Sequence, residues 1–203
     1  MTKDADTPTR RRLGPVERHA ELVAAGLALV KEGSLDRLTA PDVARVAGVS
    51  KALVFHYFPT QRDLQAAVAR AGAEELVGEF DRLDPSLPDS ERLAAGLLGF
   101  ITYIEQQPAS YAVLSRSAGT DPQLRAIFEE TRERVVRIIS EAVGIAEPSP
   151  RLRLMLRGWI AMVEETTLHW LDERPMARDE LIDLLTRVAF GLLPLAAAEA
   201  PNS

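Results

Sequence analysis

Residues 38–58 have the sequence LTAPDVARVAGVSKALVFHYF. Thr39 and Ser50 each stand just before a run of helix-forming residues, where a hydroxyl side chain can accept a hydrogen bond from a free backbone N–H. Gly48 separates the two runs, and glycine readily ends a helix in a left-handed conformation. The segment therefore predicts two short helices joined by a tight turn. This is the helix-turn-helix pattern, whose second helix lies in the major groove of DNA, although two packed helices with a glycine between them are also common elsewhere.

Apolar residues recur at steps of three and four along almost the whole chain, which is the period of an α-helix, and no segment shows convincing β-strand alternation. Thr60 followed by Asp63 is typical of the start of a further helix. We therefore predict an all-α protein of about nine helices, over residues 15–32, 40–47, 51–57, 60–83, 89–107, 108–118, 121–144, 149–174 and 176–199. Within residues 38–58, the predicted core consists of Leu38, Val43, Val46, Val49, Val54 and Phe58.

The composition excludes several classes of protein. The 203 residues include no cysteine, which excludes disulfide frameworks, zinc fingers and thiol catalysis. No apolar run approaches the ~20 residues that a membrane helix needs, and the N-terminus shows no signal peptide. We therefore expect a cytoplasmic protein with no membrane partner.

The charge is distributed unevenly along the chain. The net charge of −6 argues weakly against nucleic acid as a partner. However, residues 1–70 hold 11 Lys and Arg against 8 Asp and Glu, whereas residues 71–203 hold 13 against 22. A polyanionic partner is therefore expected to meet the first 70 residues.

The sequence contains no pattern that predicts catalysis or a metal site. The three histidines, His19, His56 and His169, are far apart, and none has metal-ligand spacing to another histidine and a carboxylate. There is no nucleophile elbow and no glycine-rich phosphate loop. Glu164 and Glu165 are adjacent, so on a helix they point about 100° apart, and we interpret them as a surface or interface pair. We expect no enzymatic activity, no metal and no cofactor.

The longer segment from Val16 to Val68, above all AGVSKALVFHYFPTQRDLQAAV (residues 47–68), resembles the DNA-binding domain of the tetracycline-repressor (TetR) family of bacterial regulators. The helical layout of the remainder is similar to the ligand-binding and dimerisation domain of that family. The resemblance implies a flexible basic arm at 1–14, a helix-turn-helix DNA-binding domain at 15–60 and a helical ligand-binding and dimerisation domain at 61–203.

As a function, the resemblance implies a dimeric regulator that binds double-stranded DNA, and most simply a repressor that a small-molecule ligand releases from a palindromic operator. The helix over 60–83, which links the two domains, would be the lever of that release. The alternatives are an activator or ligand-independent regulator and, in a different class, a helical small-molecule-binding protein or enzyme with a vestigial helix-turn-helix.

The resemblance also implies roles for single residues. Thr39 matches a position that contacts phosphate, and Lys51 and Ala52 match positions that reach base edges, where lysine can donate to guanine and an alanine methyl can pack on thymine. The predicted DNA-binding residues are Thr39, Arg45, Ser50, Lys51, Ala52, Phe55, His56, Tyr57 and Arg62.

The chain departs from the family at three positions of this surface. Leu53, Phe55 and Gln61 stand where the family often has threonine, tyrosine and lysine, so two hydroxyls and one cation are missing. Phosphate anchoring is therefore expected to depend on neighbouring arginines. The arginines at 10–12 would reach the minor groove or the DNA backbone, or else form a solvated basic tail.

The last two predicted helices are apolar on more than one side, so each must be buried on two sides. By resemblance, one side packs against the same helices of a second subunit. The alternative is a monomer whose last two helices are core. The residues predicted for the dimer interface are Leu152, Leu156, Val163, Trp170, Leu181, Leu184, Leu185, Val188 and Leu192.

The family usually encloses a small-molecule pocket among the helices that correspond to residues 89–174, although aromatic and methionine side chains at helical spacing are more often plain core. Glu165 and His169, four residues apart, could recognise a polar or cationic group or pair across the dimer interface. The candidate ligand-binding residues are Phe100, Tyr103, Tyr111, Phe128, Met155, Trp159, Met162, Glu165 and His169.

Overall fold

The computed structural model describes residues 14–106, 108, 111 and 121–197. In this part of the chain the regular structure is entirely helical, which confirms the all-α prediction. The helices are α1 (Pro15–Glu32), η1 (Leu35–Arg37), α2 (Ala40–Ala47), α3 (Lys51–Tyr57), α4 (Gln61–Asp81), α5 (Asp89–Gln106), α7 (Pro122–Ala142), α8 (Pro150–Glu173) and α9 (Arg178–Ala197). The predicted helix over 108–118 lies almost wholly outside the described residues. Among the described helices, none combines the length and the apolar character needed to cross a membrane.

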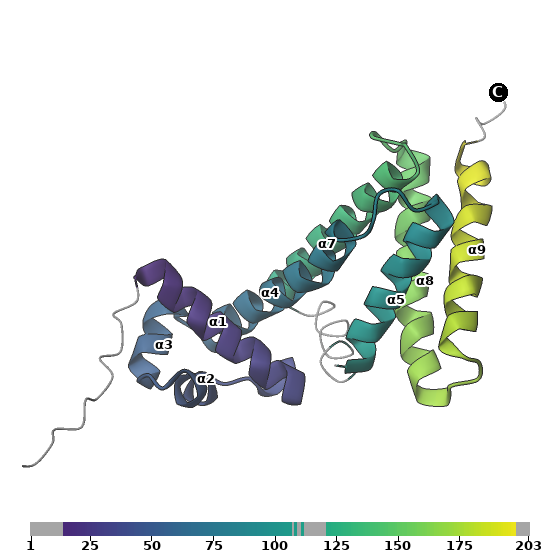
Figure 1. Ribbon diagram of the computed structural model, residues 1–203. Helices are drawn as coiled ribbons and strands as arrows, with labels where there is room; N and C mark the ends of the chain where they lie inside the picture. The colour runs from purple at the N-terminus through teal and green to yellow at the C-terminus, as the bar shows by residue number, and fades with distance from the viewer. Residues whose placement is uncertain (1–13, 107, 109–110, 112–120, 198–203) are drawn as a thin grey trace, which may run out of the picture.

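Helices α1, α2 and α3 and the first half of α4 form a small N-terminal domain (Figure 1, purple to blue). Its core contains one almost fully buried aliphatic side chain from each helix, Leu22, Val43, Val54 and Leu64. Burial of such a side chain stabilises a fold by ~1.5–3 kcal/mol. Helix α1 lies close to α4, because Gly26 has no side chain and an added Cβ would overlap the side chain of Val68.

Val46 is not a core residue, so that prediction is wrong. Helix α2 buries Ala40, Val43, Ala44 and Ala47, and Val46 lies on the opposite side of the helix with its side chain exposed. A helix of eight residues has room for only one buried stripe.

Helices α4 and α7 run side by side from the N-terminal domain into the body of the molecule (Figure 1). Thr60 and Asp63 form the predicted capping box at the start of α4. Near this end, the side-chain amide of Gln65 donates to the backbone carbonyls of Leu35 and Leu38 at 3.1 and 3.5 Å, which ties α4 to the segment before α2.

Helices α5, α8 and α9 form the body together with α7 (Figure 1, teal to yellow). Two tryptophans of α8 join it to the chain that follows. The indole N–H of Trp159 donates to the carbonyl of Leu185 at 3.1 Å, and that of Trp170 donates to the carbonyl of Met176 at 2.9 Å. Both indoles are therefore buried with their donors satisfied.

Candidate nucleic-acid interface and internal cavity

The turn between α2 and α3 has the geometry that the sequence predicts. Gly48 adopts a left-handed conformation, φ 62° and ψ 41°, which a residue with a side chain rarely adopts. The hydroxyl of Ser50 accepts a hydrogen bond from the backbone N–H of Leu53 at 3.2 Å, so that Ser50 caps α3 as expected. The turn and the cap fix the orientation of α3 relative to α2.

Four predicted DNA-binding residues share one exposed face of α3. Lys51, Ala52, Phe55 and His56 are exposed, whereas Val54, between them in sequence, is fully buried in the domain core. The ammonium of Lys51 lies 5.5 Å from the centre of the Phe55 ring, a favourable cation–π distance. The face thus combines one positive charge, one methyl group and two rings, which suits the edges and methyl groups of bases in a major groove.

Tyr57 is half-buried at the end of α3 and packs beside His19 of α1. His19 is not among the residues that the sequence predicts for this surface. The His19 ring lies 4.9 Å from that of Phe58 and 6.3 Å from that of Tyr57. His19 thus borders the α3 surface through a contact between α1 and the end of α3. No sequence signal predicts this contact, because it depends on how the two helices cross.

Three other predicted DNA-binding residues, Thr39, Arg45 and Arg62, lie beside carboxylates. Thr39 caps α2, and its hydroxyl donates a hydrogen bond to the carboxylate of Asp42. This hydrogen bond and the nearby Arg45 hold the pKa of Asp42 below its usual value. Arg45 lies 3.5 Å from Asp42, and Arg62 lies 3.9 Å from Asp121. Exposed ion pairs of this kind contribute little to stability, so both arginines can turn towards a phosphate at small cost.

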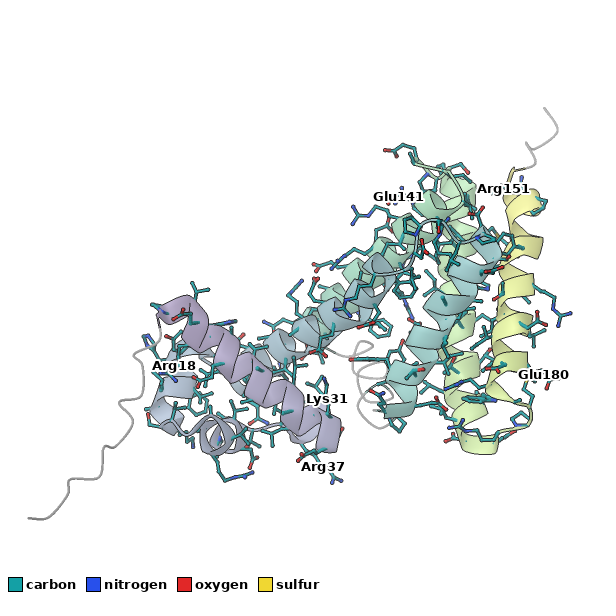
Figure 2. All side chains as sticks on the ribbon, viewed as in Figure 1. Arg18, Lys31, Arg37, Glu141, Arg151 and Glu180 are labelled. Atoms are coloured by element: carbon teal, nitrogen blue, oxygen red, sulfur yellow. The ribbon has the colours of Figure 1, made fainter. Side chains whose placement is uncertain are left out.

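Of the charged side chains labelled in Figure 2, Arg18, Lys31 and Arg37 belong to the N-terminal domain, whereas Arg151 lies in the body with Glu141 and Glu180. The predicted contacts of the arginines at 10–12 lie outside the described residues.

A cavity lies between α4, α5, α7 and α8, with about 800 Å³ of empty space, part of it open to solvent. Its wall is almost entirely apolar and includes five of the predicted ligand-binding residues, Phe100, Tyr103, Tyr111, Phe128 and Trp159. Burial and the charge of Glu75 raise the pKa of Tyr103 to about 12, so its phenol is neutral and can donate a hydrogen bond.

The other four predicted ligand-binding residues do not line this cavity. Met155 and Met162 pack against the core from outside the cavity wall. Glu165 and His169 pair with each other at 3.2 Å on the outer face of α8, each with 72% of its side chain exposed. These four residues lie outside the cavity because the inner face of α8 is the one that carries Trp159, Val163 and Glu164.

The polar part of the cavity wall is an ion pair between Arg132 of α7 and Glu164 of α8. Two guanidinium nitrogens of Arg132 donate to the two carboxylate oxygens of Glu164, one of them at 3.2 Å. Glu164 is only 8% exposed within the subunit, so the interpretation of Glu164 and Glu165 as a surface or interface pair is wrong for Glu164. Burial raises the pKa of Tyr111, and so do the charge of Glu164 and the hydrogen bond to it.

Arg132 continues into a chain of alternating charges between α7 and α8. Its guanidinium also donates to Glu129 at 3.4 Å, and Glu129 in turn accepts from Arg157 of α8. Burial alone would lower the pKa of Arg132, but its bond to Glu164 and the charges of Glu164 and Glu129 raise it. The guanidinium is therefore charged at any physiological pH.

Helices α4 and α7 each belong to the cavity wall and to the N-terminal domain. Ile127 of α7 lines the cavity and is also part of the N-terminal core, and Ala73 of α4 lies against both. Two exposed ion pairs also bridge the two helices, Arg70 with Glu130 at 2.6 Å and Glu74 with Arg134 at 2.6 Å. Helices α4 and α7 therefore connect the cavity wall to the domain that contains α3.

Most residues predicted for the dimer interface lie inside the subunit instead. Leu152, Leu156, Val163, Trp170, Leu181 and Leu185 are at most 6% exposed, because α5, α7, α8 and α9 pack these side chains against one another. These six side chains therefore belong to the core of the subunit.

The other three predicted interface residues, Leu184, Val188 and Leu192, are at least partly exposed, and so is Leu154 of α8. Leu184 is 41% exposed and Leu154 is 70% exposed, while Val188 and Leu192 are half-buried. Gly158 and Gly191 lie on the same outward faces, and a Cβ added at either would meet nothing within 4 Å.

Among the described residues, no group of three or more His, Cys, Asp or Glu side chains could hold a metal ion.

Comparison with known proteins places both parts of the chain. The family described as "Bacterial regulatory proteins, tetR family" matches residues 22–68, and "Tetracyclin repressor-like, C-terminal domain" matches residues 89–192. The chain is similar in structure to a tetR-family transcriptional regulator from Streptomyces coelicolor, with a TM-score of 0.79 and 28% identity over 91% of this chain and 84% of that one.

Two curated relatives come from Mycolicibacterium smegmatis. The HTH-type transcriptional activator FasR is 25% identical over 89% of this chain and 84% of its own length. The HTH-type transcriptional repressor KstR2 is 25% identical over 83% of this chain and 82% of its own length.

Proposed function

Because the chain belongs to the tetR family of DNA-binding transcriptional regulators, we propose that it is a homodimeric repressor that a small molecule releases from a palindromic operator. The observation that carries the proposal is the position of Ile127 and Ala73, which lie in the cavity wall and against the N-terminal core at once. A ligand in the cavity therefore touches the helices that hold the DNA-reading domain. Since it acts on DNA, we place the protein in the cytoplasm.

The exposed face of α3 would read the DNA. Lys51 would donate to a guanine, and the Ala52 methyl would pack on a thymine. The exposed arginines Arg45 and Arg62 would bind phosphates on either side of α3, with Thr39 at the start of α2 as a further phosphate contact. Phe55, His56 and Tyr57 complete the surface.

The outward faces of α8 and α9 would form the dimer. Leu154 and Leu184 are large apolar side chains exposed to solvent, and Gly158 and Gly191 leave room for another helix to approach. A twofold axis at this face brings the same patch of both subunits together. Two α3 helices about 34 Å apart would then meet successive major grooves of a palindrome.

Ligand release would be a shift between two populations of the dimer. A ligand that binds the cavity more tightly when the DNA-binding domains are splayed lowers the affinity of the dimer for the operator. The largest possible decrease equals the ratio of the ligand's affinities for the two states. Helices α4 and α7 are the connecting elements, since both reach from the cavity into the N-terminal domain.

Selection from a random DNA pool with the intact dimer tests the proposal. We expect enrichment of a short palindrome, with an affinity that falls steeply as salt rises. If the protein is shown to be a dimer and still enriches no palindrome, the proposal of a repressor on a palindromic operator is wrong.

A reporter placed behind the selected operator separates repression from activation. A repressor lowers expression of the reporter, and a variant deficient in DNA binding restores it, whereas an activator gives the opposite pair of results. The relatives named above include one of each kind.

A further inference from the structure

Arg132 and Glu164, the two charged residues of the cavity wall, differ in the number of oppositely charged groups that they contact. Arg132 contacts two carboxylates, those of Glu164 and Glu129. Glu164, in contrast, contacts one cation among the described residues, Arg132, and its remaining polar contact is the hydroxyl of Tyr111. Glu164 is also the more deeply buried of the two, with 10% of its side chain exposed against 23% for Arg132.

This difference decides which charged ligand the cavity can accept. An anion that displaced the Glu164 carboxylate from Arg132 would leave that carboxylate buried without a counter-charge, which is strongly unfavourable. A cation that took Glu164 would leave Arg132 beside Glu129, so both buried charges would remain paired. The arrangement therefore favours a positively charged ligand.

The aromatic side chains around Glu164 favour the same charge. Phe100 and Tyr111 meet edge to face with their ring centres 5.7 Å apart, and both line the cavity. The ring of Phe128 already has the Arg132 guanidinium over it at 4.5 Å, which shows that a cation fits against this wall. Ring faces attract cations most strongly where water is excluded.

We propose that the effector is a lipophilic organic monocation whose positive centre pairs with Glu164 and whose apolar body fills the space between Phe100, Tyr111 and Trp159. The inference rests on the proposed ligand-responsive function and names the class of its ligand. Binding would replace the tie between Arg132 and Glu164, one of the contacts that hold α7 to α8.

The test uses three aromatic probes of nearly the same shape, N-methylacridinium, acridine and acridine carboxylate, at a pH where they are cationic, neutral and anionic. Binding to the full-length dimer is followed by probe fluorescence and by quenching of the tryptophans. We expect the cation to bind at least about tenfold more tightly than the neutral probe, and the anion most weakly.

Variants assign the preference to Glu164. Glu164→Gln should weaken binding of N-methylacridinium about tenfold or more and leave acridine unchanged, because the amide keeps the shape and loses the charge. Glu165→Gln is the matched control, since it makes the same change on the next residue of α8, where the side chain is exposed, and should leave all three affinities unchanged.

A reciprocal variant keeps the test decisive if Glu164→Gln does not fold. Arg132→Gln frees Glu164, so N-methylacridinium should raise the melting temperature of this variant more than that of the wild type. Equal binding of cation and neutral probe, tighter binding of the anion, or no effect of either variant would overturn the proposal. These titrations contain no DNA, so their failure is distinct from a failure to select an operator.

Discussion

Lys51 is the one permanently charged side chain of α3, and its ammonium is held beside Phe55 on the exposed face. We expect Lys51→Ala to weaken operator binding by ~1–3 kcal/mol and to relax the preference at one base position, because a lysine donor to guanine is lost. Fluorescence anisotropy with the selected operator and its single-base variants measures both effects.

Two further substitutions test the assignment of Lys51 to a base. Lys31→Ala is the matched control, because Lys31 lies at the end of α1 away from α3 (Figure 2), and it should leave the preference unchanged. Tyr57→Phe removes a hydroxyl that can donate to a phosphate oxygen, and we expect it to weaken binding to all sequences about equally. A uniform effect of Lys51→Ala would show that this lysine binds phosphate instead.

Asp63 gives a prediction about pH. The hydroxyl of Thr60 at 2.8 Å, the side chain of Gln123 at 3.3 Å and the backbone N–H of Thr60 at 3.0 Å all donate to its carboxylate and hold its pKa below 3.8. A carboxyl group whose pKa is lower in the folded state stabilises the fold above its unfolded pKa, and this contribution is lost as the pH falls through the folded pKa.

We therefore expect Asp63→Asn to be less stable than the wild type at neutral pH and the difference to shrink below about pH 4. Urea unfolding at a series of pH values measures the free energy of unfolding of both proteins. A difference that stays constant down to pH 2 would mean that the hydrogen bonds to Asp63 do not depend on its charge.

At the scale of the elements, the crossing of α1 and α4 depends on Gly26. We expect Gly26→Ala to destabilise the protein by ~1–3 kcal/mol, because the added methyl overlaps Val68 in a packed core. Gly78→Ala, in the same α4, meets nothing within 4 Å and should be neutral or stabilising by ~0.5–1 kcal/mol, since alanine is the better helix former. Thermal unfolding distinguishes the two, and equal effects would contradict a tight crossing at Gly26.

The elements themselves could be predicted wherever their signals are local. The left-handed turn at Gly48 and the caps at Ser50 and Thr60 depend on neighbours within three residues, and the structure confirms each of them. Helix ends were predicted to within about two residues for the same reason.

The orientation of a helix that is apolar on two sides could not be predicted in this way. For α8, the sequence pattern does not say which side of the helix faces inward. The side of Trp159 and Glu164 does so, rather than the side of Glu165 and His169, because α5, α7 and α9 pack around it. The buried pair of Glu164 with Arg132 was missed for the same reason, since the partners are 32 residues apart.

At the scale of the whole molecule, the distribution of charge fits a dimer that depends on both of its subunits. The first 70 residues carry 11 Lys and Arg against 8 Asp and Glu, so a single domain offers few cations to phosphates. The acidic remainder is expected to repel DNA from the body. Specific binding is thus expected to require two domains on one operator, which makes the dimer interface a direct test of function.

Leu184→Glu is the substitution that tests this interface. In a twofold dimer, it places two like charges at the same apolar contact. We expect the variant to be a folded monomer by analytical ultracentrifugation and to bind the full palindrome roughly 100-fold or more weakly, because the second half-site no longer adds to the first. Its affinity for an isolated half-site should be unchanged, since α3 is untouched.

Leu98→Glu is the matched control, because Leu98 of α5 is 40% exposed and Leu184 of α9 is 41% exposed. The two variants carry the same change at the same degree of exposure on different helices. Leu98→Glu should remain a dimer with full operator affinity. If it dissociates while Leu184→Glu does not, the subunits meet across α5 rather than across α8 and α9, and the spacing of the two α3 helices must be worked out again from that face.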